Sequence, residues 1–232
     1  MFSNRYIFIY SSVMVIIVAV ALTIVAVQLK PAQQYNERVE KMQNILTSVN
    51  IESTPKNAET LYNKYIVSTI VVDNKGGVIE GIDAFSVDMR LENKKPSDQK
   101  NLPVFICVND ASDSLYIVPL RGKGLWGPIW GYISFKTDLN TIAGCMYAHK
   151  GETPGLGAEI DTRTFQQQFS GKTIYDDQRN FVSVIVHKGG AKKDDVHGVD
   201  AISGGTITSK GLEAMLRDGL KEYTPYFNNI KK

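Results

Sequence analysis

The longest hydrophobic pattern in the chain is an uncharged run near its N-terminus. The 24 residues from Tyr6 to Leu29 contain no charged side chain and are rich in Val, Ile and Ala. About 20 apolar helical residues cross the ~30 Å hydrocarbon core of a bilayer, whereas a signal peptide has an apolar region of about 7–15 residues. Because Lys30-Pro31 does not form a small-residue cleavage site, residues 1–30 are predicted to be an uncleaved transmembrane anchor.

The next segment has the spacing of helices. Apolar residues recur three and four positions apart at Val39, Met42, Ile45, Leu46 and Val49. Thr54-Pro55 is a typical start for a second helix, with Thr as the cap and Pro in the first turn. Residues 31–68 are therefore interpreted as a helical connecting region.

Short apolar runs separated by turn residues then predict strands. They lie at Thr69–Asp73, Val78–Ile82, Val104–Val108, Leu115–Leu120, Ile129–Lys136, Ile142–Tyr147 and Val182–His187. The polar stretch Glu92–Lys100 predicts a solvated loop, and helices are expected at Ala158–Phe169 and from about Lys210 to Tyr223. The predicted class is α+β, with a single N-terminal transmembrane helix followed by one largely antiparallel-sheet domain with flanking helices over residues 69–232.

Charge and composition exclude several classes of protein. The formal net charge is +2 and the lysines are scattered, which argues against a nucleic-acid-binding face. The two cysteines and three histidines lack the spacing of metal ligands, so no metal site is predicted. Cys107 is interpreted as a buried thiol, with a Cys107–Cys145 bridge as the alternative.

Two nucleotide-binding patterns occur in part and fail on context. Gly122–Gly127 matches G-x-G-x-x-G, but the residues that follow predict a strand where a dinucleotide site needs the start of a helix. Gly171-Lys172-Thr173 resembles the end of a P-loop, but Gln166 stands where its first glycine belongs. Neither pattern is adopted.

The stretch from Asp200 to Gly211, DAISGGTITSKG, combines a flexible backbone with hydroxyl groups. Gly204-Gly205 frees the chain to bend, and a helix expected from about Lys210 would offer unpaired N–H groups to an anion. The residues alone leave two interpretations open. One is a glycine turn in which Thr208 or Ser209 caps the last helix, and the other is a phosphate site beside the Thr206 hydroxyl.

The same stretch resembles a motif of the FMN-binding-domain family. Asp200-Ala-Ile-Ser-Gly-Gly-Thr206 is similar to the motif Asp-x-x-Ser/Thr-Gly-Ala-Thr, with Gly205 in place of the usual Ala. The resemblance implies FMN bound covalently to Thr206 through a phosphoester that a flavin transferase forms. Glu152–Gly157 resembles the family's loop beside the flavin, and Gly124–Gly127 resembles a third family segment.

The N-terminal third narrows the resemblance. Leu29-Lys-Pro-x-Gln33, Asn36 and Lys41-x-Gln-Asn-Ile-Leu46 are similar to the family of C subunits of Na⁺-translocating NADH:quinone reductases. This resemblance implies an electron carrier that relays electrons between an iron–sulfur centre and a flavin of partner subunits, within a complex that also has A, B, D, E and F subunits. Alternatives are the G subunit of an Rnf-type complex, a membrane-anchored binding or sensor domain that carries no flavin, and a structural anchor protein.

The resemblance also assigns expected roles to individual residues. The phosphate end of FMN is expected at Ser203, Gly204, Gly205, Thr206 and Thr208. The ring is expected at Leu125, Trp126, Thr153, Leu156 and Gly157, with a core position as the alternative for Trp126. Asp200 is expected to be recognised by the transferase, and Glu152 to order its own loop.

The side of the membrane on which the large domain lies is the least determined property. Lys30, Arg38 and Lys41 follow the anchor and only Arg5 precedes it, which by charge favours a cytoplasmic domain. Long domains translocate largely regardless of charge. The family resemblance implies a single-pass protein of the bacterial inner membrane with the C-terminal domain on the periplasmic side.

Overall fold

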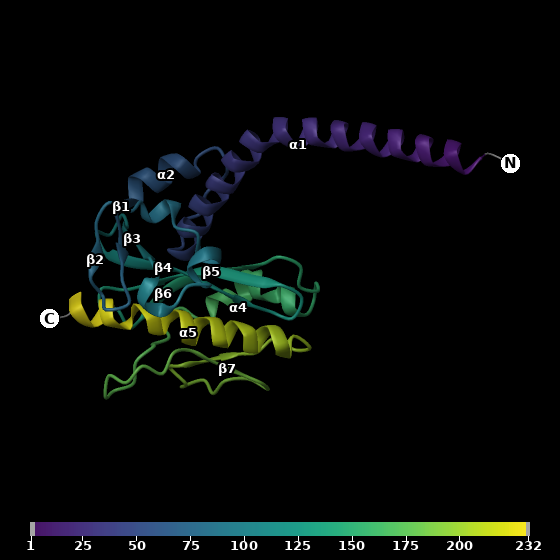
Figure 1. Ribbon diagram of the computed structural model, residues 1–232. Helices are drawn as coiled ribbons and strands as arrows, with labels where there is room; N and C mark the ends of the chain where they lie inside the picture. The colour runs from purple at the N-terminus through teal and green to yellow at the C-terminus, as the bar shows by residue number, and fades with distance from the viewer. Residues whose placement is uncertain (1–2, 231–232) are drawn as a thin grey trace. The chain divides into compact units, whose positions relative to one another are not determined.

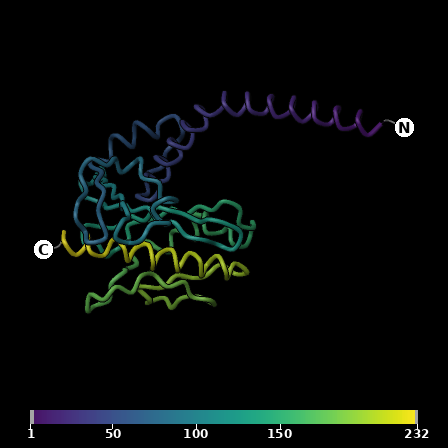
Figure 2. The backbone as a smooth tube through the Cα atoms, viewed as in Figure 1, coloured from purple at the N-terminus to yellow at the C-terminus, as the bar shows by residue number. Residues whose placement is uncertain are grey.

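The computed structural model describes residues 3–230 (Figures 1 and 2). The chain divides into two compact units. The units are Met1–Lys41 and Met42–Lys232. Helix α1 (Asn4–Ser48) runs without interruption through Pro31 and across the division. The predicted domain boundaries after residues 30 and 68 stay predictions.

The first unit carries the predicted anchor. Between Tyr6 and Leu29 the large apolar side chains are exposed rather than packed in a core. Among the described residues, α1 is the one helix that is long and apolar enough to cross a membrane. Such a surface is unfavourable in water and favourable in hydrocarbon, so this helix has the properties expected of an anchor.

A six-stranded sheet forms the centre of the second unit. Its spatial order is β2-β1-β3-β4-β5-β6, and every neighbouring pair is antiparallel, which confirms the predicted pairing. The strands are β1 (Ile66–Val72), β2 (Val78–Ile79), β3 (Leu102–Val108), β4 (Ser114–Lys123), β5 (Pro128–Phe135) and β6 (Ile142–His149). The predicted strand from Val78 to Ile82 is thus only two residues long.

Both faces of the sheet are covered. Helix α5 (Thr206–Ile230) places Leu212, Leu216 and Leu220 against one face, where they are fully buried with core residues of β3, β4 and β5. On the other face, the end of α1 meets the sheet, and the Ser134 hydroxyl donates to the Ser48 carbonyl oxygen at 2.6 Å. A sheet buried on both faces explains why β3 and β5 read as continuous apolar runs.

The two cysteines are free thiols on opposite faces of the sheet. Cys145 belongs to the core that includes α5, as does Val104 of β3. Cys107 is three residues after Val104 on the same strand, and alternation along a strand points it to the other face. Burial raises the pKa of Cys107 to about 11 and that of Cys145 to about 12. The interpretation of Cys107 as a buried thiol is confirmed.

The short elements correct two further expectations. Helix α2 (Ala58–Tyr65) begins three residues after Pro55, because Thr54 instead starts a turn in which its N–H donates to the Asn57 side chain at 2.6 Å. The stretch predicted as a solvated loop contains the end of α3 (Met89–Glu92) and the 3-10 helix η2 (Ser97–Gln99). The 3-10 helix η1 (Ala84–Ser86) precedes α3.

The helix expected at Ala158–Phe169 is two separate elements. The 3-10 helix η3 (Gly157–Asp161) ends at Thr162, which has an extended backbone, and α4 (Arg163–Gln167) begins directly after it. The Thr162 side chain accepts from the Phe165 N–H, so it caps α4 and interrupts the continuous helix.

A two-stranded parallel sheet lies outside the main one. Strand β7 (Ile185–His187) is shorter than the predicted Val182–His187, and it pairs with β8 (Gly198–Asp200), which was not predicted. Figure 1 shows α5 between the main sheet and β7. The Val186 N–H of β7 donates to the Glu213 carboxylate of α5 at 2.7 Å, which holds the small sheet against this helix.

Candidate functional site

Helix α5 begins at Thr206, four residues before the predicted start at Lys210. The Ser209 N–H donates to the Gly205 carbonyl oxygen at 2.9 Å, which makes residues 205–209 the first helical turn. Thr208 and Ser209 are buried inside this turn instead of preceding the helix as caps. The Ser209 hydroxyl accepts from the Ile202 N–H at 3.1 Å and so ties the incoming loop to the helix.

Glycine is favoured at the two positions before Thr206 for different structural reasons. Gly204 has a φ of +72°, which favours glycine. At Gly205 a Cβ would lie 2.9 Å from Ile202 Cγ2 and 3.3 Å from the Gly157 nitrogen. Gly205, which stands where the family motif usually has Ala, therefore leaves room for Ile202 and for the loop that contains Gly157.

A cavity of about 220 Å³ opens where α5 begins. Three segments that are far apart in the sequence line it, and they are the three segments that carry the family resemblance. The lining residues are Leu125, Trp126, Glu152, Thr153, Leu156, Gly157, Gly204, Gly205, Thr206, Ile207 and Thr208. The fold thus brings together nine of the predicted site residues, and it adds Glu152 and Ile207.

The rim of the cavity is apolar and exposed. Trp126 is 69% exposed and Ile207 is 59% exposed, and Leu125 and Leu156 also have more than a third of their surface open. The alternative core position for Trp126 is therefore wrong. Ile207 was missed because its exposure depends on where α5 begins, and a start at Lys210 places it outside the helix. Such a rim offers flat apolar contact to a ring system.

The first turn of α5 lines the cavity and is suited to an anion. Thr206 is exposed at the first position of α5, and the first turn of this helix contains no acidic side chain. The first N–H groups of a helix have no intrahelical acceptor, and they carry the positive end of the helix dipole. A phosphate on the Thr206 oxygen would lie beside these groups.

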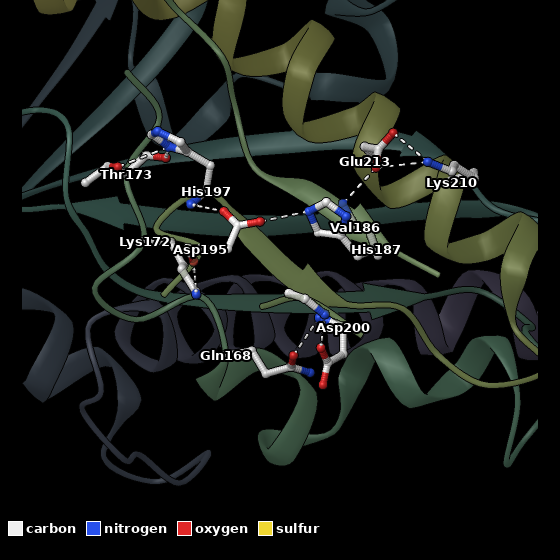
Figure 3. A network of polar contacts seen from close by, with 11 residues as sticks. Gln168, Lys172, Thr173, Val186, His187, Asp195, His197, Asp200, Lys210 and Glu213 are labelled. Atoms are coloured by element: carbon white, nitrogen blue, oxygen red, sulfur yellow. Dashed lines mark hydrogen bonds and ion pairs between the residues drawn. The ribbon is translucent and has the colours of Figure 1, made fainter. Parts of the chain in front are cut away.

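The two remaining motif residues, Asp200 and Ser203, are exposed and lie outside the cavity lining. Asp200 ends β8, where its carboxylate accepts the Ala191 N–H at 2.7 Å and its own N–H donates to the Gln168 side chain at 2.8 Å (Figure 3). Both residues are accessible to another protein. The roles predicted for individual site residues stay predictions.

The histidines lie in strands and loops and form local pairs. His187 Nε2 is 3.0 Å from Asp195 Oδ2, and His197 contacts Thr173, as Figure 3 shows. The backbone N–H of His197 donates to the Asp195 carboxylate, and this hydrogen bond is the largest cause of the lowered pKa of Asp195. Among residues 3–230, no group of three His, Cys, Asp or Glu side chains has the arrangement of a metal site.

Comparison with known proteins agrees with this geometry. Residues 124–221 match the model of the FMN-binding domain, a range that contains the whole cavity lining. The C subunit of the Na(+)-translocating NADH-quinone reductase of Pasteurella multocida is 34% identical, over 89% of this chain and 86% of its own length. The chain belongs to the family of C subunits of Na(+)-translocating NADH-quinone reductases.

Other members of the family support the same assignment. The C subunit of Vibrio vulnificus is 31% identical over 85% of this chain and 83% of its own length. The crystal structure of the C subunit from Parabacteroides distasonis superposes with a TM-score of 0.79 at 43% identity, over 86% of this chain and 96% of that one. The structure of Shewanella oneidensis NqrC gives a TM-score of 0.74 at 26% identity, over 84% of this chain and 99% of that one.

Family membership confirms the predicted resemblance and the fold. The motif at Asp200–Thr206 left the C-subunit family and the G subunit of an Rnf-type complex open, and similarity over most of the chain favours the former. The family is named for an oxidoreductase of NADH and quinone that translocates sodium, and its FMN-binding domain identifies the class of cofactor.

Proposed function

We propose that this chain is the electron-transferring C subunit of a membrane Na⁺-translocating NADH:quinone reductase, with FMN attached to Thr206 through a phosphoester. The observation that carries the proposal is the cavity at the start of α5. It is lined by all three motif segments, with Thr206 exposed at the first helical position.

The residues present fit an FMN group in two parts. The N–H groups of the first turn of α5 suit the phosphate, and Leu125, Trp126, Leu156 and Ile207 suit the ring. A volume of about 220 Å³ is below the roughly 300–1,000 Å³ of pockets that enclose a whole ligand of this class. The cavity would therefore hold the phosphate end, while the apolar rim would support the ring.

Among the hydroxyl groups, Thr206 is placed for esterification and Thr208 is not. Thr208 is 1% exposed, and its hydroxyl donates to Glu152 Oε2 at 2.6 Å. A hydroxyl has one proton to donate, so this one is not available to a phosphate. Thr206 is exposed, so its hydroxyl lies at a surface that a transferase can reach.

Bound FMN would supply one-electron and two-electron transfer, and this chemistry needs no acid, base or nucleophile from the chain. The residues of the site would hold the phosphate and offer an apolar surface to the ring. A covalent link suits an electron carrier because the cofactor is retained between turnovers.

Family membership supports a proposal for the place of this chain in the complex. We propose that electrons arrive from an iron–sulfur centre held by partner membrane subunits and leave to a flavin of another partner. The partners are the A, B, D, E and F subunits, and this chain itself binds neither NADH nor quinone. The helix α1 would anchor the chain in the bacterial inner membrane with residues 42–232 on the periplasmic side, where a flavin transferase would act.

Flavin fluorescence of the denatured chain tests the attachment site. Wild type, Thr206→Val and the control Thr224→Val are co-expressed with a flavin transferase and separated on a denaturing gel. We expect fluorescent bands for wild type and Thr224→Val and a dark band for Thr206→Val. A dark wild-type band beside a fluorescent control substrate would favour the sensor or structural alternative, and a fluorescent Thr206→Val band would refute Thr206 as the site.

A further inference from the structure

The carboxylate of Glu152 lies where the three segments of the site meet. It is 5% exposed, and Oε1 accepts the Trp126 N–H at 2.8 Å while Oε2 accepts the Thr208 hydroxyl at 2.6 Å. The Glu152 N–H donates to His149 Nδ1 at 3.1 Å, which holds the glutamate to the end of β6. One side chain therefore connects the Gly124–Gly127 loop, the Glu152–Gly157 loop and the first turn of α5.

Two glycines make room for this carboxylate. A Cβ at Gly124 would lie 2.5 Å from Glu152 Oε1, and a Cβ at Gly157 would lie 2.5 Å from Glu152 Oε2. Neither glycine has a positive φ. A Cβ at Gly157 would also lie 2.5 Å from Thr208 Oγ1, and a Cβ at Gly124 would lie 3.1 Å from Ile129 Cγ2. Glu152 and these neighbours together leave room for glycine alone, because a Cβ essentially never approaches another atom to 2.5 Å.

The carboxylate is bound by neutral donors in a buried place. Its two hydrogen bonds come from an amide and a hydroxyl, whereas the buried Glu92 is paired with Lys95 at 2.8 Å. Hydrogen bonds to an ionised group are stronger than neutral ones, and a buried carboxylate that loses them is left strongly disfavoured. Glu152 thus holds the three segments in one arrangement through contacts within this chain.

We propose that Glu152 is a positioning residue for the flavin site. It acts through Trp126 and Thr208, which it holds so that the apolar rim and the N–H groups of α5 face one cavity. This inference rests on the proposed function, because the flavin is the group for which the site is arranged. It goes beyond the expectation that Glu152 orders only its own loop.

Hydrogen exchange of the full chain in detergent tests the arrangement without a flavin. All variants carry Thr206→Val, so that the chain stays unloaded, and the control is Glu92→Ala at another buried glutamate. In Glu152→Ala we expect amide exchange in residues 124–127 and 206–209 to be about tenfold faster or more, as loss of hydrogen bonds to a charged acceptor implies. Glu92→Ala should leave both segments unchanged.

Glu152→Gln tests whether the hydrogen bonds of this side chain or its negative charge hold the three segments together. Glutamine can accept the Trp126 N–H through Oε1 and donate to the Thr208 oxygen through Nε2. Exchange in the two segments should therefore stay close to that of the unsubstituted chain. Unchanged exchange in Glu152→Ala, or acceleration spread equally over the whole domain, would overturn the proposal.

A double substitution gives a second measurement on the same variants. Gly124→Ala alone should accelerate exchange in residues 124–127, because its Cβ displaces the carboxylate. In the Glu152→Ala background its added effect should be severalfold smaller, since only the milder 3.1 Å approach to Ile129 Cγ2 then remains. Equal effects in both backgrounds would contradict the inferred contact.

Loaded protein shows whether the arrangement reaches the cofactor. With Thr206 restored, Glu152→Ala should shift the visible absorption and midpoint potential of the attached flavin, and Glu92→Ala should not. An unshifted spectrum and potential would overturn the positioning role. If wild type carries no flavin, the proposed function fails and the positioning role with it. The exchange data would then test only the Glu152 link among the three segments.

Discussion

The close approach of α5 to the end of β4 gives the sharpest prediction of stability. A Cβ at Gly211 would overlap the carbonyl oxygen of Lys123, which is backbone and cannot turn away. A Cβ at Gly219, two turns further along the same helix, would lie 2.7 Å from Leu120 Cδ2, the end of a flexible side chain. The substitutions Gly211→Ala and Gly219→Ala are therefore matched in helix and chemistry and differ in what they meet.

The expected difference follows from two opposing effects. Glycine to alanine inside a helix stabilises by about 1 kcal/mol, and this gain is common to both variants. Overpacking costs about 1–3 kcal/mol, and the cost is greatest where backbone must move. We expect Gly219→Ala to be near neutral and Gly211→Ala to be less stable than it by roughly 2 kcal/mol.

Urea unfolding of the full chain in detergent, followed by tryptophan fluorescence, measures this difference. The midpoint should fall for Gly211→Ala with an unchanged slope, because the surface exposed on unfolding is the same. Lys123 precedes Gly124, so Gly211→Ala should also reduce flavin loading. Equal stability of the two variants, or greater stability of Gly211→Ala, would refute the packing argument.

Three further outcomes are expected from buried groups. The thiols of Cys107 and Cys145 should not react with Ellman's reagent at pH 8 until the chain unfolds. Because burial raises their pKa values above 9.0, the free energy of unfolding should fall as the pH rises beyond about 9. This fall should be smaller in the variant in which both cysteines are replaced by alanine. Ser183 has a φ of +63° and a buried hydroxyl without a hydrogen-bond partner among the described residues, so Ser183→Gly should raise the free energy of unfolding by about 1 kcal/mol, and a loss in urea unfolding would count against this. Ser134→Ala removes the hydroxyl that lies 2.6 Å from the Ser48 carbonyl oxygen and 3.1 Å from the Gly144 carbonyl oxygen, and it should cost about 1–2 kcal/mol by the same assay, whereas a neutral result would mean that these contacts contribute nothing.

Properties that depend on neighbours in sequence could be predicted from the sequence. The anchor follows from the length of one uncharged run, and the sheet follows from apolar runs between turn residues. The three segments of the candidate site were each recognisable as short motifs with glycines at particular positions. For the anchor and the sheet the deciding interactions are local, or depend on the solvent that surrounds the segment, whereas the three site segments were identified by their resemblance to family motifs.

The start of α5 shows where local signals are insufficient. Thr208 and Ser209 are good capping residues, and the sequence alone favoured a helix that begins after them. In the structure their hydroxyls bond to Glu152 and to the Ile202 N–H, so both are inside the helix and Thr206 is its first residue. Glu152, the hydrogen-bond partner of the Thr208 hydroxyl, is 56 residues away in sequence.

The same reason accounts for the other differences. Strand β7 pairs in parallel with β8 only because the chain returns beside it after the intervening loop. The break between η3 and α4 at Thr162 arises because its side chain accepts the Phe165 N–H of α4. Glu152 was expected to order one loop, yet only the folded chain places Trp126 and Thr208 within reach of its two oxygens. A motif determines which groups are available, and a buried polar group is satisfied by whichever partners the tertiary fold brings to it.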